Sequence, residues 1–195
     1  DIANPTHTTA FQIEEFRRPE YEVSATIESG PFFIKDAVQM TTKANYYAGG
    51  PLADAGVNWR VSACSASFRP PNTDGFSFGP WQPWWKRPQS DQCYWQGNKT
   101  GQTDSMGLET LAVKLSTMKV PMTIAMTAEA TVIDVNRQAF ATEKTWLVHP
   151  ASHYVGLKTD TQFVSKGDPI ELDMVVFNVD GHRLENRTIR ATATH

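Results

Sequence analysis

Apolar and polar residues alternate along most of this chain, which is the pattern of β-strands that bury one face. Three such runs occupy the first third: residues 21–27, residues 38–47 and residues 57–63. Pro19 predicts a kink between the first run and a short strand in line with it that starts at Phe11. The loop AGGPLADAG joins the second and third runs, and we expect these two to form a β-hairpin. Their buried faces are predicted to carry Val38, Met40, Thr42, Ala44, Tyr46, Val57, Trp59, Val61 and Ala63.

The second half continues in the same way. Residues 108–119 fit a helix or a strand, and the flanking Gly107 and Pro121 favour the strand. A long alternating strand at residues 124–133 precedes a polar turn at 134–138 and an extended run that Pro150 ends. An extended pattern restarts at Tyr154, and a loop at 166–169 and a hairpin turn at Asp180–Gly181 separate three further predicted strands. These carry Phe163, Ile170, Leu172, Met174, Val176 and Ile189.

Nearly every predicted element is thus extended, with turn signals about every 8 to 15 residues, which indicates an all-β protein built of sandwiches. Residues 68–107 interrupt the pattern, since they hold five of the twelve prolines and four of the six tryptophans. We expect an irregular insertion there, ordered by its own aromatic side chains.

Composition narrows the possible functions. The 195 residues suffice for one large or two small domains, and the net charge of −3 leaves no basic excess to follow a phosphate backbone, so no nucleic-acid partner is expected. No apolar run reaches the roughly 18 residues of a membrane span, and no signal peptide is visible. Because the chain starts without methionine and in mid-pattern, we expect a piece of a longer protein, without membrane contact of its own.

Cys64 and Cys93 are the two cysteines, and they enclose a loop at whose ends a disulfide would be well placed. One bridge closing about 30 residues would stabilise the fold by roughly 3 to 4 kcal/mol and would place the protein in an oxidising compartment. The alternative is a pair of ordinary buried thiols. The spacing is too wide for a redox pair or a zinc site.

Few residues suggest chemistry. His149 and His153 have the spacing of a metal pair on a helix, but Pro150 argues against a helix there, so we expect no metal site. Neither a nucleophile elbow nor an HExxH motif is present, and the carboxylates are scattered singly, so we expect neither catalysis nor a cofactor.

The aromatic cluster of the insertion is the one candidate contact surface. It could bind a sugar or a protein partner, or it could be a small core that folds the insertion onto a sheet edge. Two N-x-Ser/Thr glycosylation motifs start at Asn98 and Asn186, and they matter only in a host that glycosylates secreted proteins. The cluster consists of Trp81, Trp84, Trp85, Tyr94 and Trp95.

Several phrases, taken in order, resemble the middle of bacterial α2-macroglobulins, from residue 11 to the end. They are EFRRPEYEV, YYAGGPLADAGVNWRV, ATVIDVNRQ, LVHPASHYVGLK and FVSKGDPIELDMVVFNVDG. The resemblance implies tandem macroglobulin domains, each a seven-stranded antiparallel β-sandwich of roughly 100 residues. Residues 1–150 would be a domain like the third macroglobulin domain, enlarged by the insertion at about 68–107, and residues 151–195 the opening strands of the next.

The same resemblance implies a role in periplasmic defence. Proteins of this family trap endoproteases that cut a bait segment, and many then bond to the attacker through a thioester. Cys64 is followed by Ser-Ala-Ser and Cys93 by Tyr-Trp-Gln, and neither run is identified as the thioester motif of the family; no segment has a bait character. The chain would therefore be framework, next to other macroglobulin domains in a full-length parent that is anchored in the periplasm as a lipoprotein and meets the proteases.

The tail of the chain should be incomplete as a domain. About 43 residues after Ala151 are too few to close a seven-stranded sandwich, so this tail should leave an apolar face and an open strand edge, and be mobile or pair with a neighbouring molecule. The alternative function is a secreted adhesin or carbohydrate-binding sandwich that uses the tryptophan-rich loop as its contact surface.

Overall fold

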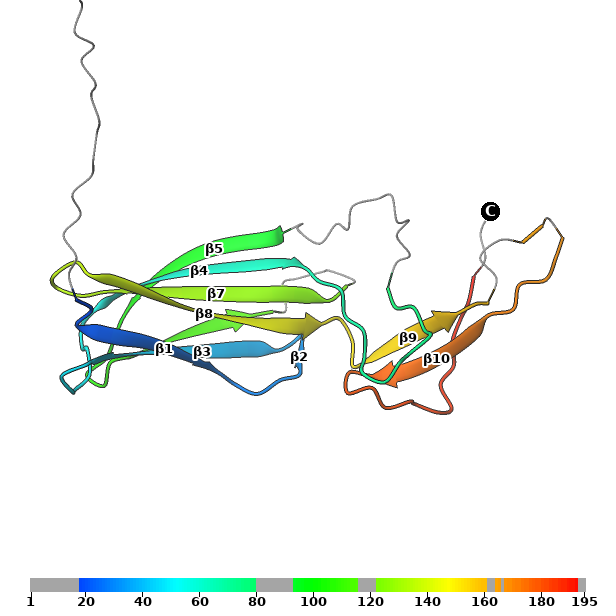
Figure 1. Ribbon diagram of the computed structural model, residues 1–195, viewed down its shortest axis with the longest axis horizontal. Helices are drawn as coiled ribbons and strands as arrows, with labels where there is room; N and C mark the ends of the chain where they lie inside the picture. The colour runs from blue at the N-terminus through cyan, green and yellow to red at the C-terminus, as the bar shows by residue number, and fades with distance from the viewer. Residues whose placement is uncertain (1–17, 80–92, 116–121, 161–163, 166, 193–195) are drawn as a thin grey trace, which may run out of the picture.

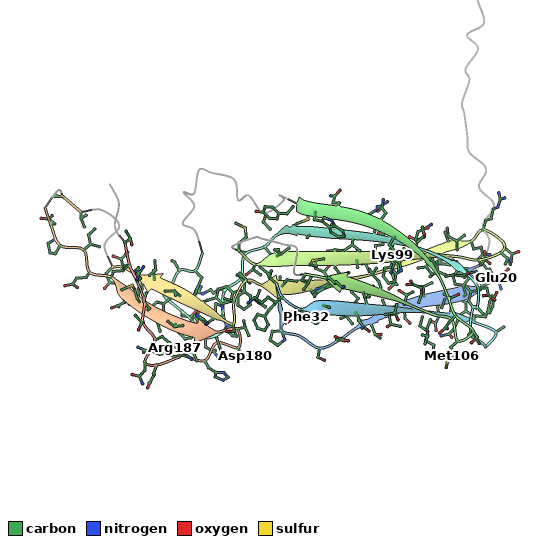
Figure 2. All side chains as sticks on the ribbon, turned by 180° about the vertical axis from the view of Figure 1, so that it is seen from behind. Glu20, Phe32, Lys99, Met106, Asp180 and Arg187 are labelled. Atoms are coloured by element: carbon green, nitrogen blue, oxygen red, sulfur yellow. A yellow bond between two sulfur atoms is a disulfide. The ribbon has the colours of Figure 1, made fainter. Side chains whose placement is uncertain are left out.

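A computed structural model describes residues 18–79, 93–115, 122–160, 164–165 and 167–192. The described part is all-β, as expected, and it contains ten strands in three sheets. Two sheets form a sandwich, and a small third sheet lies beyond one end of it along the long axis (Figure 1). Seen from behind, Phe32 marks the end of the sandwich that faces the third sheet, whereas Glu20 and Met106 lie at the opposite end (Figure 2).

The strands of the sandwich come from the whole of residues 21–149. The three-stranded sheet has the order β1 (Tyr21–Ile27), β3 (Ala37–Tyr46) and β6 (Leu108–Lys114). The five-stranded sheet has the order β2 (Phe32–Phe33), β8 (Ala139–His149), β7 (Ile124–Ile133), β4 (Gly56–Ser65) and β5 (Cys93–Gln102). Neighbouring strands are antiparallel, except that β2 runs parallel to β8 over two residues.

The core lies between these two sheets, where the predicted alternation places it. Strands β4 and β7 pair over ten residues, and along both of them every second side chain is buried. Trp59 of β4 is 1% exposed, and Met40 of β3 reaches the same core from the other sheet. All five positions predicted to share one face of the strand at 38–47 do so, with Val38, Met40, Thr42 and Ala44 fully buried and Tyr46 half-buried.

Tyr21 joins the two sheets at the end of the sandwich distant from the third sheet. Its hydroxyl oxygen lies 2.8 and 2.7 Å from the carbonyl oxygens of Val132, near the end of β7, and Gln138, just before β8, and its single proton is donated to one of them at a time. Its ring meets the edge of Phe140, with 4.9 Å between the centroids. Burial, with a smaller contribution from the charge of Asp134, raises the pKa of Tyr21 to about 12.

The predicted hairpin of residues 38–63 is wrong in its pairing, although both strands exist. Strand β3 pairs with β1 and β6, whereas β4 pairs with β5 and β7 in the opposite sheet. The connection crosses the end of the sandwich and buries Leu52, whose carbonyl oxygen accepts a hydrogen bond of 2.7 Å from the Thr103 hydroxyl group. Alternation shows which face of a strand is buried but does not show which strand lies beside it.

The predicted irregular insertion is also partly wrong, because its last third contains the ten-residue strand β5. Nearly all of its side chains are exposed, since β5 lies at the edge of the five-stranded sheet and extends past the opposite sheet. An edge strand without a buried face shows no hydrophobic alternation, so periodicity could not detect it.

Beyond β8, the third sheet pairs β9 (His153–Lys158) with β10 (Asp173–Asn178). Of the three strands predicted after residue 160, only β10 forms among the described residues. Ile170, Leu172 and Ile189 lie in irregular chain, because an extended segment becomes a strand only beside a partner. The turn predicted at Asp180–Gly181 is present. Phe163 and the predicted strand at Phe11 fall outside the described residues.

Replacing Tyr21 with phenylalanine should lower the free energy of unfolding by about 1–3 kcal/mol, because the carbonyl groups of Val132 and Gln138 lose the one hydroxyl donor that they share. Chemical denaturation of the variant measures this loss. Tyr47→Phe is the matched control, because Tyr47 is 63% exposed and should change stability by less than about 0.5 kcal/mol. Equal stability of the two variants would show that Tyr21 does not join the sheets.

Candidate functional site: the joint between the sandwich and the C-terminal sheet

The chain passes from the sandwich to the third sheet at residues 149–153, and side chains of both parts form polar contacts at this joint. Strand β8 ends at His149, Pro150 interrupts the ladder, and β9 starts at His153. The carbonyl oxygen of His149 accepts a hydrogen bond of 3.1 Å from the Ile34 amide. A backbone hydrogen bond therefore holds the last residue of the sandwich in place, independently of the contacts of its side chain.

Three side chains form a hydrogen-bonded row across the joint. The Tyr154 hydroxyl group lies 2.7 Å from Nδ1 of His149 and 2.8 Å from the Thr123 hydroxyl group. The Phe68 ring covers the row, with centroids 4.6 Å from His149 and 5.0 Å from Tyr154. Burial lowers the pKa of His149 and raises the pKa of Tyr154, so both side chains are neutral near pH 7. A neutral His149 can then accept at Nδ1 from Tyr154, which accepts from Thr123.

A second contact comes from residues 68–78, which we call the clamp segment. Ser77 and Leu157 of β9 exchange two backbone hydrogen bonds of 2.8 and 2.9 Å, so the clamp segment adds one short bridge to the third sheet. The rings of Phe76 and Phe78 meet Phe177 of β10 with centroids 6.2 and 6.1 Å apart. Together these contacts hold the C-terminal sheet against a segment that precedes it by about 80 residues.

Gly156 is the residue of β9 that allows this approach. A Cβ atom placed there would lie 2.7 Å from the Phe78 ring, which is closer than carbon atoms pack. The clamp segment is itself fixed by Arg69, which donates to the Thr73 carbonyl oxygen at 2.6 Å and to its hydroxyl group at 3.2 Å. The Thr73 hydroxyl group donates in turn to the Pro70 carbonyl oxygen at 2.6 Å.

Sequence reasoning misses this site. The alternation marks Tyr154 only as the start of an extended run, and it leaves the clamp segment inside an irregular insertion. The available signal is the pair Phe76 and Phe78, because two aromatic residues on alternate positions suggest a short extended piece that buries one face. The expected apolar face of the tail is present: Val155, Leu157 and Met174 of β9 and β10 are each about 40% exposed on the face away from Phe177. The expected mobility of the tail stays a prediction.

The two histidines have different surroundings. His149 is buried in the joint, whereas His153 is exposed and has Nδ1 3.4 Å from the Ser152 hydroxyl group. Within the described ranges, no three metal-ligating side chains gather. The structure therefore places His149 in the packing of the joint and His153 at the surface.

Cys64 and Cys93 form a disulfide, which is the first of the two alternatives. They are direct cross-strand partners at the end of β4 and the start of β5, next to a bulge at Ala63 and Cys64. The bridge joins the two ends of residues 65–92 and fixes the first residue of the edge strand β5. A disulfide is the state expected in an oxidising compartment.

The tryptophan cluster is only partly described. Trp81, Trp84 and Trp85 lie outside the described residues, while Tyr94 and Trp95 are on β5, 40% and 44% exposed. Asn98 is exposed on the same strand, and Asn186 is exposed in irregular chain. A shallow polar groove runs over the outer face of the five-stranded sheet, lined by Asn58, Arg60, Asn98, Thr100, Glu129 and Thr131. The described part has no helix that could cross a membrane.

Comparison with known structures gives the architecture a context. The chain superposes on native Escherichia coli α2-macroglobulin with a TM-score of 0.59 over 87% of its residues, at 12% identity and over 11% of that chain. The fold is that of a segment of bacterial α2-macroglobulins. Salmonella α2-macroglobulin reacted with methylamine gives a TM-score of 0.59 over 87% of this chain and 12% of that one, also at 12% identity. E. coli α2-macroglobulin activated by porcine elastase gives 0.59 over 85% and 15%, at 14% identity.

A comparison of amino-acid sequences finds a relative that is not a macroglobulin by name. Circularly permutated Ras protein 2 of Dictyostelium discoideum is 27% identical over 193 aligned residues, which include 88% of this chain. The chain spans about 5% of the length of that protein and 11–15% of the macroglobulin chains. No protein-family model matches the sequence. The similarities therefore concern one segment of much longer proteins.

The joint should be sensitive to acid. Because burial lowers the pKa of His149 in the folded protein, its contribution to stability is complete above the ordinary value of about 6.5 and is lost as the pH falls through that value toward the folded one. Between pH 7.5 and 5, the melting temperature of the natural protein should fall more than that of His149→Asn, which offers a polar atom near Nδ1 without titrating. His153→Asn, at an exposed histidine, should keep the full acid response. Parallel curves for all three proteins would contradict the assignment.

Gly156→Ala should push Phe78 away from β9 and loosen the C-terminal sheet, at a cost of about 1–3 kcal/mol. Limited trypsin digestion can report this, because cleavage after Lys158 should become faster in the variant. Gly56→Ala is the control, since Gly56 is also in a strand and has no atom within 4 Å of the added methyl group. Unchanged cleavage in Gly156→Ala would mean that the clamp segment does not hold β9.

Proposed function

We propose that this chain is a framework segment of a large protease-trapping protein of the α2-macroglobulin type. The observation that carries the proposal is the extent of the structural match. It covers 87% of 195 residues, or about 170 residues, so it cannot be confined to the sandwich at 1–150 and includes part of the chain beyond the joint. A match in one sandwich alone would suggest a common fold, whereas a match that crosses the joint also includes the connection.

The comparison also supports a framework role. The TM-score is 0.59 against the native E. coli protein and the form activated by elastase, and 0.54 against the form activated by trypsin, so a segment of similar fold is present in the native and the activated structures. A segment that keeps its fold in both states is suited to carry other parts of a trap and not to react itself. The chain is accordingly proposed to act without catalysis and to meet endoproteases only through its full-length parent.

The disulfide and the proposed framework role together support an oxidising compartment for the protein. An oxidising compartment outside the cytosol is where the Cys64–Cys93 bridge persists, and for a bacterial trap that compartment is the periplasm. Anchoring of the parent as a lipoprotein belongs to the same proposal. The relative from D. discoideum supports a broader version, in which the same framework segment serves a long protein of another kind.

Residues 151–195 are proposed to begin the next macroglobulin domain. A two-stranded sheet is marginal alone, and this one exposes one apolar face. That face carries Val155, Leu157 and Met174. Neighbouring chain in the parent would cover it and complete a second sandwich. Hydrogen exchange tests this: amides of β10 should exchange more slowly in the full-length parent than in this chain, and equal rates would place the domain boundary elsewhere.

The exposed Trp95 supports the adhesive alternative, since an exposed indole is a common part of a sugar-binding surface. Trp95→Ala separates the two proposals. Loss of glycan binding with an unchanged melting temperature would favour an adhesin over a framework segment.

The trap itself is tested on the full-length parent. Incubated with an endoprotease, it should suppress cleavage of a large protein substrate while cleavage of a small chromogenic peptide continues, because a caged protease still admits small molecules. A parent with its bait segment deleted is the control and should leave both activities intact. If large and small substrates are cleaved alike by proteases of several specificities, the protein is not a trap.

A further inference from the structure

Strand β5 is the longest free edge of the sandwich. Its ten residues pair with β4 on one side, and no described residue pairs with the other side. The remaining outer strands of the two sheets are shorter: β1 and β6 have seven residues each and β2 has two. A row of unpaired backbone N–H and C=O groups of this length is a template for another strand.

This edge lacks most of the devices by which proteins protect an edge. β5 contains no proline and one charged residue, Lys99, and its bulge lies at the far end beside the disulfide. The edge is also held in place before any partner arrives, because the disulfide fixes Cys93 and the ladder to β4 fixes the rest. A strand that is already ordered loses little conformational entropy when it pairs.

The side chains of β5 form two distinct rows. On the side of the core, Trp95, Gly97 and Lys99 lie beside Ala63, Val61 and Trp59 of β4. The Trp95 indole lies over Gly97, since a Cβ atom there would be 2.5 Å from its ring. On the outer side, the residues are the uncharged polar Gln96, Asn98 and Thr100.

We propose that two copies of this chain pair antiparallel through β5, with Gly97 opposite Gly97 of the second copy. In this register Lys99 of each copy lies opposite Trp95 of the other, on the same face of the sheet. An ammonium group over an indole is attractive, and the two-fold symmetry makes this contact twice. On the outer face Gln96 meets Asn98 of the other copy, and their amide groups hydrogen-bond.

The partner that pairs with this edge is a second copy of the chain, because the strand is complementary to itself. Along the core side of β5 the order is Trp95, Gly97, Lys99. In an antiparallel pair centred on Gly97, each Trp95 therefore faces a Lys99 of the other copy, and no two like charges face each other. The paired glycines leave room for both indoles, which already lie over them. Two five-stranded sheets would join into one continuous sheet of ten strands.

Analytical ultracentrifugation of this chain over a concentration series tests the pairing. A dimer should form as concentration rises, and Trp95→Ala or Lys99→Ala should raise its dissociation constant by about 5- to 30-fold, since each removes both cation–π contacts. Lys114→Ala, an exposed lysine on the edge strand β6, is the matched control and should leave the constant unchanged. Leu157→Asn, on the apolar face of β9, should also leave it unchanged.

Cross-linking tests the register. Mixed Gln96→Cys and Asn98→Cys chains should oxidise to a cross-linked pair in much higher yield than either variant alone, with the Cys64–Cys93 bridge intact by peptide mapping. A monomer at the highest soluble concentration would overturn the proposal. So would a dimer that Leu157→Asn dissociates while Trp95→Ala and Lys99→Ala do not, because the apolar face of the C-terminal sheet would then hold the copies together.

Discussion

The ten-residue ladder between β4 and β7 is the constraint on which the rest of the fold depends. Its register places Val57, Trp59 and Val61 on the same face as their partners Val132, Ala130 and Ala128, and a shift of one residue would turn this entire face to solvent. Trp59 lies directly opposite Ala130, one of the small alanine side chains on this face of β7. This fixed face determines where the three-stranded sheet, the connection between β3 and β4, and the edge strand β5 pack.

At the joint, three contacts of different chemistry act on one short strand. The Tyr154 hydroxyl group binds β9 to the sandwich, Ser77 binds its backbone, and Phe78 covers it where Gly156 leaves space. Each alone is a contact of a few kcal/mol at most. Because all three act on the six residues of β9, each adds to the hold of the sandwich on the C-terminal sheet. Such a connection suits the proposed framework role, in which the position of one module sets that of the next.

The sequence determined the strands better than their arrangement. Residues 38–47, 57–63 and 124–133 bury alternate side chains, and each strand formed where its period of two predicted. The pairing of β3 and β4 could not be read, because Leu52 and the loop around it look like a hairpin connection and cross between sheets instead. β5 was missed because this edge strand buries neither of its faces. The joint was missed for a third reason: His149, Tyr154, Thr123 and Phe68 come from four separate places, and nothing local predicts that they meet.

The disulfide and the clamp segment together define how the molecule would carry mechanical load. A pull on the C-terminal sheet reaches the sandwich through the peptide bonds of residues 150–152 and, in parallel, through the Ser77–Leu157 bridge into the clamp segment. That second route enters the sandwich at the end of β4, where the Cys64–Cys93 bond spreads the force over two strands of the sheet. The pair of backbone hydrogen bonds at Leu157 is a non-covalent link of this second route. A pull that breaks it would peel β9 away from the clamp segment, while the disulfide would keep β4 and β5 together behind it.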